Sequence, residues 1–149
     1  MKEAPSIILN IGTQLLTLFS QRYQYFYSIG IVEWRVMTVL SQESNVRLKD
    51  ICTVLIADKA AISRALAKLH EKRLVTAKED QWHKSVKQWN LTPAGLALHD
   101  VILEETNQLS YDIMDGVPAE HVQILHSTFK KLNENIQKHS HSGKTTKST

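Results

Sequence analysis

The segment that most constrains the fold runs from Val46 to Thr92, where a helical pattern passes directly into an alternating one. Within residues 58–69 the apolar side chains recur at helical spacing: Ile62, Ala65, Leu66 and Leu69. This spacing places them on one face of a helix. The opposite face carries small, polar and basic residues, namely Lys59, Ala60, Ser63, Arg64, Ala67 and Lys68. A helix that buries one face and presents such a surface outward is suited to the major groove of DNA.

A shorter helix and a turn are expected just before this long helix. Residues 49–55 should form the shorter helix and bury Ile51, Val54 and Leu55. The turn Ile56-Ala57-Asp58 follows, and its aspartate is a good residue to cap the next helix. The positive end of that helix dipole would also favour a nearby phosphate. The two helices and their turn predict a helix-turn-helix.

The residues after the long helix follow a period of two. Apolar and polar side chains alternate from Leu74 to Leu91, on both sides of a polar stretch at residues 78–85. This pattern predicts a two-stranded hairpin, and residues 46–48 could add a short strand. The expected fold class is therefore mainly α: a winged helix-turn-helix with an α+β wing, and with further helices at both ends of the chain.

Two helices are expected before this lobe, which spans about residues 31–91. An apolar stripe predicts the first helix over residues 5–27, and its second half is unusually aromatic. Residues 32–41 predict the next helix. Its inward face should carry Trp34, Val36, Met37 and Leu40.

Two more helices are expected after the hairpin. Thr92 is a suitable cap and Pro93 a suitable first residue for a helix that continues to about residue 114. Pro118 begins a last helix, which should end near residue 138. Its apolar positions form a narrow, coiled-coil-like seam that requires another helix against it. That seam consists of Val122, Leu125, Phe129, Leu132 and Ile136.

The length and composition fit one domain, over residues 1–139. The 149 residues suffice for a real core, and five glycines and three prolines favour helices over tight turns. Residues 140–149 contain no apolar side chain and are expected to be a disordered tail. The single cysteine excludes an internal disulfide and favours a reducing cytoplasm. We expect no secretory signal and no membrane span.

Charge is distributed unevenly along the chain. Residues 59–87 carry eight lysines and arginines against three acids, a balance of +5. Residues 92–120 carry six acids and no lysine or arginine, a balance of −6. One explanation is that the charged residues simply keep the exposed faces of the helices solvated. Because the basic block coincides with the helix-turn-helix, we interpret it as a surface for a polyanion.

Several short segments, in this order, resemble the MarR family of winged-helix transcriptional regulators. They are Glu33-Trp34-Arg35-Val36, Ala61-Ile62-Ser63-Arg64, Leu74-Val75 and Leu91-Thr92-Pro93-Ala94-Gly95, and the resemblance extends over residues 7–138. It implies a homodimer whose first and last two helices, about residues 5–27 and 93–138, interleave between the subunits. The implied interface includes Ile7, Ile11 and Leu15 together with the seam of the last helix. The two winged helices would bind the two half-sites of a pseudo-palindromic double-stranded DNA.

The resemblance also implies which residues contact DNA. Ser63 and Arg64 match a polar pair on the family's recognition helix, and an arginine there can bind guanine in a bidentate manner. Arg47 and Lys49 are expected at phosphates. The full expected set is Arg47, Lys49, Lys59, Ala60, Ser63, Arg64, Lys68, His83, Lys84 and Lys87.

The chain departs from the family pattern in three places. The wing usually carries an aspartate and two arginines where this chain has His83, Lys84 and Ser85. Readout of the minor groove by a wing arginine is therefore not expected, and Lys84 should give a phosphate contact. Arg73 and Ile56 stand where the family has glycines. Because a positive φ would strain an isoleucine, we expect the turn at Ile56 to avoid that conformation.

Many members of this family respond to small aromatic ligands that bind between the DNA-binding lobe and the dimer helices. The aromatic residues at this junction are Tyr23, Tyr25, Phe26, Tyr27 and Trp34. They could line an apolar pocket for such an effector. The alternative is ordinary packing of the core and the interface.

Other chemistry is not indicated. Cys52 lies beside Ile51 on the expected buried side of its helix, so packing is favoured over oxidation sensing. The seven histidines lack carboxylate or cysteine partners at ligand spacing, so no metal or cofactor is expected. No arrangement of nucleophile, base and acid suggests an enzyme.

The sequence thus predicts a dimeric, ligand-responsive DNA-binding regulator, with repression as the expected effect. Two alternatives remain open. One is a winged-helix protein-interaction module that has lost specific DNA reading, which the altered wing supports. The other is a dimeric carrier of small molecules that binds no DNA.

Overall fold

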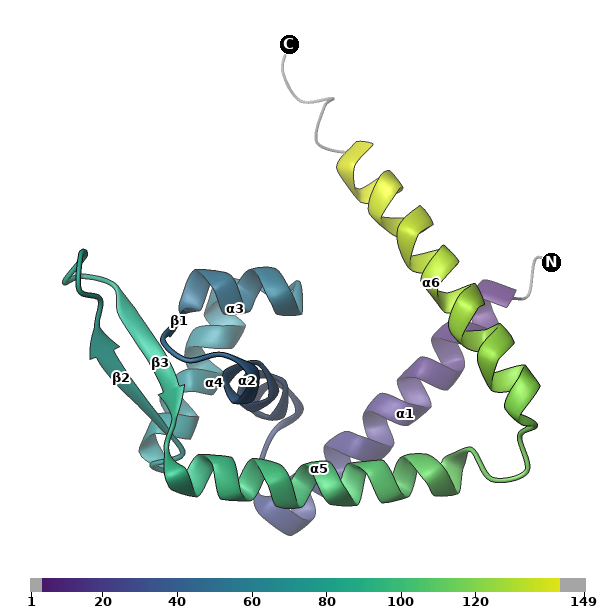
Figure 1. Ribbon diagram of the computed structural model, residues 1–149, viewed down its shortest axis with the longest axis horizontal. Coiled ribbons are helices and arrows are strands. Elements are labelled where there is room, and N and C mark those ends of the chain that lie inside the picture. The colour runs from purple at the N-terminus through teal and green to yellow at the C-terminus, as the bar shows by residue number, and fades with distance from the viewer. Residues whose placement is uncertain (1–3, 143–149) are drawn as a thin grey trace. The chain divides into compact units, whose positions relative to one another are not determined.

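The structure is a computed structural model that describes residues 4–142 of the chain (Figure 1). The elements in chain order are α1 (Ala4–Tyr27), α2 (Ile31–Gln42), β1 (Val46–Arg47), α3 (Leu48–Leu55), α4 (Lys59–Glu71), β2 (Val75–Glu79), β3 (Lys87–Leu91), α5 (Pro93–Ile113) and α6 (Ala119–Ser142). They form two compact units, one ending at Gln108 and the other starting at Leu109. The predicted fold class, a mainly helical winged helix-turn-helix, is confirmed.

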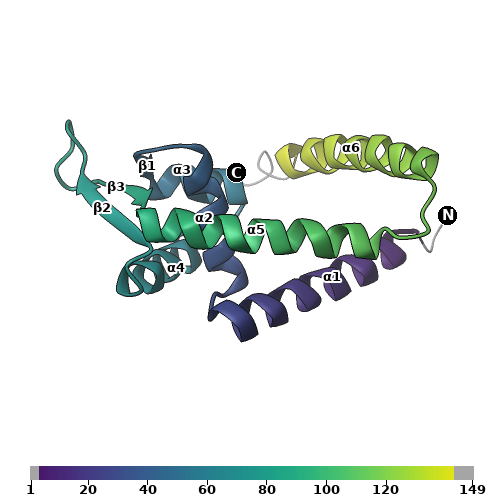
Figure 2. The same ribbon diagram turned by 60° about the horizontal axis from the view of Figure 1, so that its bottom comes forward.

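The three strands form one small antiparallel sheet in the order β1-β3-β2. The predicted hairpin is present, with Val75 opposite Leu91 and Glu79 opposite Lys87. The short strand β1 pairs with the other edge of β3, where Arg47 lies opposite Gln88. The loop between β2 and β3 projects away from the helices in both views (Figure 1, Figure 2).

The core lies between α2, α3, α4 and the sheet. The predicted inward residues of α2 are all buried, as are those of α4: Trp34, Val36, Met37, Leu40, Ile62, Ala65, Leu66 and Leu69. The prediction that Val54 is buried was wrong, because its side chain is 64% exposed. The buried stripe of α3 instead runs through Leu48, Ile51, Cys52 and Leu55, at intervals of three and four residues, and Val54 lies beside it.

Side chains cap α4 and α5 as predicted. Asp58 Oδ1 accepts a hydrogen bond from the Ala61 N–H at 2.9 Å. Thr92 Oγ1 accepts from the Gly95 N–H at 3.0 Å and donates to the Arg73 carbonyl at 2.8 Å. Gly95 packs so closely on the backbone that an added Cβ would lie 2.0 Å from the Leu74 carbonyl oxygen.

The prediction that the turn avoids a positive φ at Ile56 was wrong. Ile56 has φ 50° and ψ 49°, in the left-handed region. The residue ends α3: its N–H is 3.4 Å from the Thr53 carbonyl, and the Ala57 N–H is 3.1 Å from the Cys52 carbonyl. These bonds satisfy the last carbonyls of the helix and hold the strained conformation. Arg73, at the second glycine position of the family, has φ 60°.

One cation joins the end of α4 to the segment before α2. Lys72 Nζ lies 2.6 Å from Glu33 Oε2 and 2.6 Å from the Ser28 carbonyl oxygen. The Glu33 side chain is buried, whereas that of Lys72 is about one-third exposed. The lysine therefore neutralises a carboxylate that the fold has removed from water.

Helix α6 continues to Ser142, beyond the predicted end near residue 138. Residues 140–142, predicted as the start of a disordered tail, are helical. The rest of the predicted tail, residues 143–149, lies outside the described residues. Between residues 4 and 142, no helix is apolar over a length that would cross a membrane.

Candidate nucleic-acid interface

Helix α4 presents the predicted basic and polar face to solvent. Its four apolar side chains are buried in the core, and the residues between them are exposed: Lys59, Ala60, Ser63, Arg64, Ala67 and Lys68. The helical period alone decides this partition, because the buried residues recur every three or four positions. The result is an exposed surface with three cations and two alanines, on which no bulky side chain prevents close approach.

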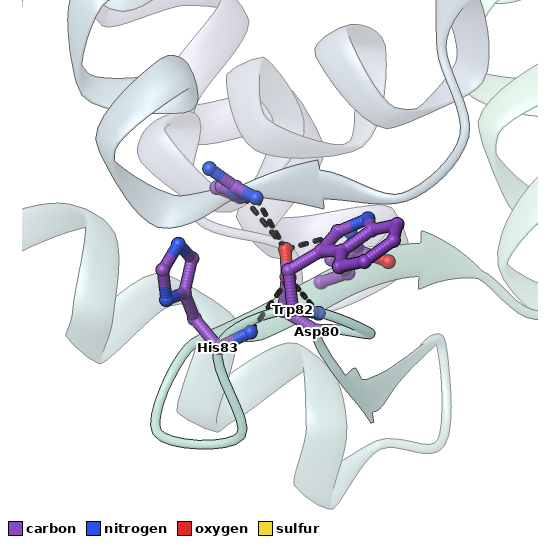
Figure 3. A network of polar contacts seen from close by, with 5 residues as sticks. Asp80, Trp82 and His83 are labelled. Atoms are coloured by element: carbon purple, nitrogen blue, oxygen red, sulfur yellow. Dashed lines mark hydrogen bonds and ion pairs between the residues drawn. The ribbon is translucent and has the colours of Figure 1, made fainter.

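Arg47 precedes α3 and Lys49 lies in its first turn, and the two side chains differ in exposure. Lys49 is exposed and can reach a phosphate. Arg47 is half-buried, and its guanidinium is held by Asp80, which lies in the loop after β2 (Figure 3). Whether Arg47 also touches a phosphate stays a prediction.

Asp80 is the centre of the polar network that shapes the wing loop (Figure 3). Its side chain is buried, and Oδ1 accepts hydrogen bonds from the N–H groups of Trp82 at 2.9 Å and His83 at 3.1 Å. Oδ2 accepts from Arg47 Nε at 2.9 Å, from Arg47 Nη2 at 2.5 Å and from Gln88 Nε2 at 2.9 Å. One carboxylate thus connects β1, the wing loop and β3.

These contacts lower the pKa of Asp80 to about 2. The hydrogen bond from the Trp82 N–H is the largest cause; burial opposes it by favouring the neutral acid, and the bonds from Arg47 and His83 lower the pKa further. Asp80 is therefore ionised at any pH at which the protein would work. The loop is closed by two backbone bonds of 2.8 Å, from Asp80 N–H to the Val86 carbonyl and from Val86 N–H to the His83 carbonyl.

Sequence reasoning missed Asp80. The resemblance directed attention to position 83 for a wing aspartate, and there the chain has histidine. A usable signal was present: an aspartate at the start of a polar loop, followed by residues whose N–H groups its side chain can bind, is a common turn signature. Its pairing with Arg47 could not be inferred from local sequence.

Residues 81–85 of the wing loop are exposed. His83 and Lys84 lie in this loop and Lys87 begins β3, and all three are at the surface. Trp82 precedes them, and its side chain is 82% exposed. The exposed face of α4 and this basic loop belong to the same compact unit.

The five aromatic residues proposed for a ligand pocket do not form one group. Tyr23 and Trp34 pack together with ring centroids 5.4 Å apart, and the Tyr27 hydroxyl donates a hydrogen bond to Glu105. Tyr25 and Phe26 are exposed and contact each other edge to face. These two line an open hollow of about 630 Å³ on α1. Whether all five line one ligand pocket stays a prediction.

The buried part of this aromatic group borders polar groups of α5. The Tyr23 hydroxyl lies 2.8 Å from Thr106 Oγ1, and burial raises the pKa of Tyr23. The hydrogen bond from Tyr27, with another from Arg22, lowers the pKa of Glu105. His99 stacks on Trp34 with centroids 5.1 Å apart, and its Nε2 is the one buried side-chain polar atom without a partner in the described part of the chain.

Apolar side chains expected in the dimer interface lie mostly at the surface of the single chain. Leu15 and Leu132 are half-buried. The other six are exposed: Ile7, Ile11, Val122, Leu125, Phe129 and Ile136. Cys52 is partly buried against the core. The described residues contain no cluster of three or more histidine, cysteine or acidic side chains placed to hold a metal.

Comparisons with known proteins agree with this arrangement. Residues 30–95 match the family described as winged helix DNA-binding domain. Among solved structures, the chain is similar to a MarR/EmrR family transcriptional regulator from Acinetobacter sp. ADP1, at 27% identity, with a TM-score of 0.80 over 92% of this chain and 96% of that one.

Two more distant structures share the fold. A MarR protein from Peptoclostridium difficile matches at 18% identity, with a TM-score of 0.82 over 92% of this chain and 89% of that one. FabT from Streptococcus pneumoniae, solved in complex with DNA, matches at 16% identity, with a TM-score of 0.78 over 92% of this chain and 97% of that one. No curated protein sequence matches the chain significantly.

Proposed function

We propose that this chain, a winged-helix protein similar to MarR regulators, binds DNA as a homodimer and represses transcription from a pseudo-palindromic operator. In this proposal each α4 enters a major groove, and the two subunits bind half-sites about one helical turn apart. Arg64 reads base edges, Ser63 supports it, and Lys49, Lys59 and Lys68 bind phosphates.

The observation that carries the DNA-binding part is the exposed face of α4. Lysines and an arginine project from a helix whose other face is fully anchored in the core. Small side chains, Ala60 and Ala67, lie between them and leave room for a groove wall. A rigid helix with cations and no bulky obstruction can follow the major groove closely.

The homodimer is supported by the apolar faces that the single chain leaves in water. Ile7 and Ile11 are exposed on α1, and Leu125, Phe129 and Ile136 are exposed on α6. Side chains of this size along two long helices are typical of surfaces that pack against another helix. A second copy of the chain supplies two such helices.

The first experiment is selection of bound duplexes from a random DNA pool, with purified protein at near-physiological salt. We expect an inverted repeat, and Arg64→Ala should abolish the preference for it. Glu71→Ala, at the exposed end of the same helix, is the matched control and should retain the motif. Recovery of no motif, with only weak and salt-sensitive binding, would favour the protein-interaction module instead.

The dimer is tested by sedimentation of the wild type and Phe129→Glu at the same concentration. Phe129 is 49% exposed and is not among the buried core residues of the single chain, so the variant should remain helical and sediment as a monomer. Lys130→Glu is the control for a charge change at the neighbouring exposed position. A wild type that sediments as a monomer at all concentrations would refute the homodimer.

A small aromatic effector is the third part of the proposal. The open hollow on α1 that Tyr25 and Phe26 line, with the Arg22 guanidinium over the Phe26 ring, is a described cavity that would suit an aromatic acid. Such acids should raise the melting temperature and weaken operator binding, because a ligand changes affinity only if it prefers one state. Ligand binding without any DNA binding would instead indicate a carrier.

A further inference from the structure

We propose that Trp82 contacts DNA from the wing, by packing its indole ring into the minor groove. This inference rests on the proposed DNA-binding function. It assigns the contact to an apolar side chain, at a position outside the expected set of His83, Lys84 and Lys87.

The exposure of Trp82 is the first observation. Of the chain's three tryptophans, Trp34 is buried and Trp89 is half-buried, whereas Trp82 is 82% exposed. The indole therefore contributes little to the core. Burying a large apolar ring against a partner surface removes much apolar area from water and is therefore favourable.

The second observation is that the backbone under the indole is fixed. The Trp82 N–H and the His83 N–H both bind Asp80 Oδ1, and the carboxyl group is buried and held by Arg47 (Figure 3). Backbone bonds between Val86, His83 and Asp80 close the loop. The wing thus carries Trp82 on an ordered turn, so that binding costs less conformational entropy.

The charges around Trp82 indicate the chemistry of its partner. Lys84 and Lys87 are exposed, as is His83, and the exposed acid of the hairpin, Glu79, lies opposite Lys87 at the far end of the loop. The complementary surface is apolar in the middle and anionic at its edges. The minor groove has this form, because deoxyribose and base edges lie between two rows of phosphates. Its width, about 6 Å, admits a flat ring edge-on, and proteins insert apolar side chains into it.

An indole contact has a different salt dependence from a lysine contact. Each phosphate contact releases counterions and therefore steepens the fall of affinity with salt, whereas an apolar contact does not. Loss of Trp82 should weaken binding equally at all salt concentrations. Loss of Lys84 should flatten the slope instead.

The experiment measures binding of the selected operator duplex over a range of salt. Trp82→Ala should weaken binding about tenfold at every salt concentration, with the slope unchanged, and Trp82→Phe should retain most of the affinity. Lys84→Ala should reduce the slope by about 0.9 for each wing. Gln81→Ala, in the same exposed loop, is the matched control and should bind as the wild type does.

Fluorescence gives an independent readout of the same contact. Acrylamide should quench Trp82 in the free protein, and the operator duplex should protect it; Trp82→Phe should remove this protected component. The inference is overturned if the wild type binds its operator while Trp82→Ala binds equally well, or while acrylamide still reaches Trp82 in the complex. An equal loss in Gln81→Ala would also overturn it. If the wild type binds no duplex, the proposed function itself has failed.

Discussion

Arg47 and Asp80 lie 33 positions apart in the sequence, yet Asp80 Oδ2 accepts two hydrogen bonds from the Arg47 guanidinium, at 2.9 Å and 2.5 Å. The carboxylate is buried, whereas the Arg47 side chain is 39% exposed. The pair connects the strand before α3 to the wing loop. The arginine expected only at a phosphate therefore also has a structural partner, and this partner organises the wing.

Asp80→Asn should loosen the wing loop without unfolding the protein. The amide would place N–H donors against the guanidinium, and it would accept backbone bonds more weakly than a carboxylate does. We expect the Trp82 and His83 amides to exchange with solvent roughly tenfold faster or more. Hydrogen exchange measures this, with Glu79→Gln at an exposed neighbouring position as control. Unchanged exchange in Asp80→Asn would contradict the role of the carboxylate.

The same carboxylate predicts a pH dependence. The pKa of Asp80 falls from an ordinary 3.8 to about 2 in the folded protein. A carboxylate whose pKa is lower in the folded than in the unfolded protein stabilises the fold at pH values above its unfolded pKa. This stabilisation is lost as the pH falls through the folded pKa. The difference in free energy of unfolding between wild type and Asp80→Asn should thus be constant above about pH 5 and shrink between about pH 4 and pH 2.

Urea unfolding of both proteins over this pH range measures the difference. Glu105, whose pKa is also lowered, is present in both proteins, so its contribution cancels. If the difference in free energy of unfolding between the two proteins stays the same down to about pH 2, the prediction that Asp80 titrates in this range is wrong.

Two glycine substitutions should have opposite effects on stability. In Gly95→Ala the new Cβ would meet the Leu74 carbonyl oxygen at 2.0 Å, and because the contact is with backbone, no side chain can move aside. We expect a loss of about 3 kcal/mol or more. In Gly12→Ala the new Cβ meets nothing within 4 Å, inside a helix, so a gain of about 0.5–1 kcal/mol is expected. Urea denaturation at one fixed protein concentration compares them.

Ile56→Gly should stabilise the protein. Ile56 adopts a left-handed conformation, which costs a non-glycine residue roughly 1–2 kcal/mol, and its side chain is 91% exposed. The greater freedom of glycine in the unfolded chain offsets about 0.5–1 kcal/mol. The expected net gain is about 0.5–1 kcal/mol in urea unfolding. Val54→Ala, also exposed on this turn's helix, should change stability by less than about 0.5 kcal/mol. A loss of stability in Ile56→Gly would mean that the side chain has a contact in solution.

The helices and the wing could be predicted because their patterns are local. The period of α4 separates Ile62 and Leu66 from Ser63 and Arg64, and caps at Asp58 and Thr92 mark where helices begin. The error at Val54 arose because three apolar residues in a short helix fit two different stripes. Only the contacts with the rest of the core select one of them.

The errors at the site arose where distant segments decide the outcome. The strain at Ile56 is accepted because the end of α3 and the start of α4 are both fixed by packing, which a rule for single residues does not include. The role of Asp80 depends on Arg47, which reaches it only after β1 pairs with β3. The contacts with DNA and between subunits stay predictions, because they depend on molecules other than this single chain.

Lys72 links three segments of the molecule through one positive charge. Its ammonium group binds the Ser28 carbonyl, just after α1, and the buried Glu33 on α2, while the residue itself ends α4. The helix that would join the subunits and the helix that would read the operator therefore meet at one positive charge. Neutralising that charge would remove one link between the end of α4 and the segment that follows α1. Operator affinity could then change although no residue at the DNA surface or the subunit interface had been altered.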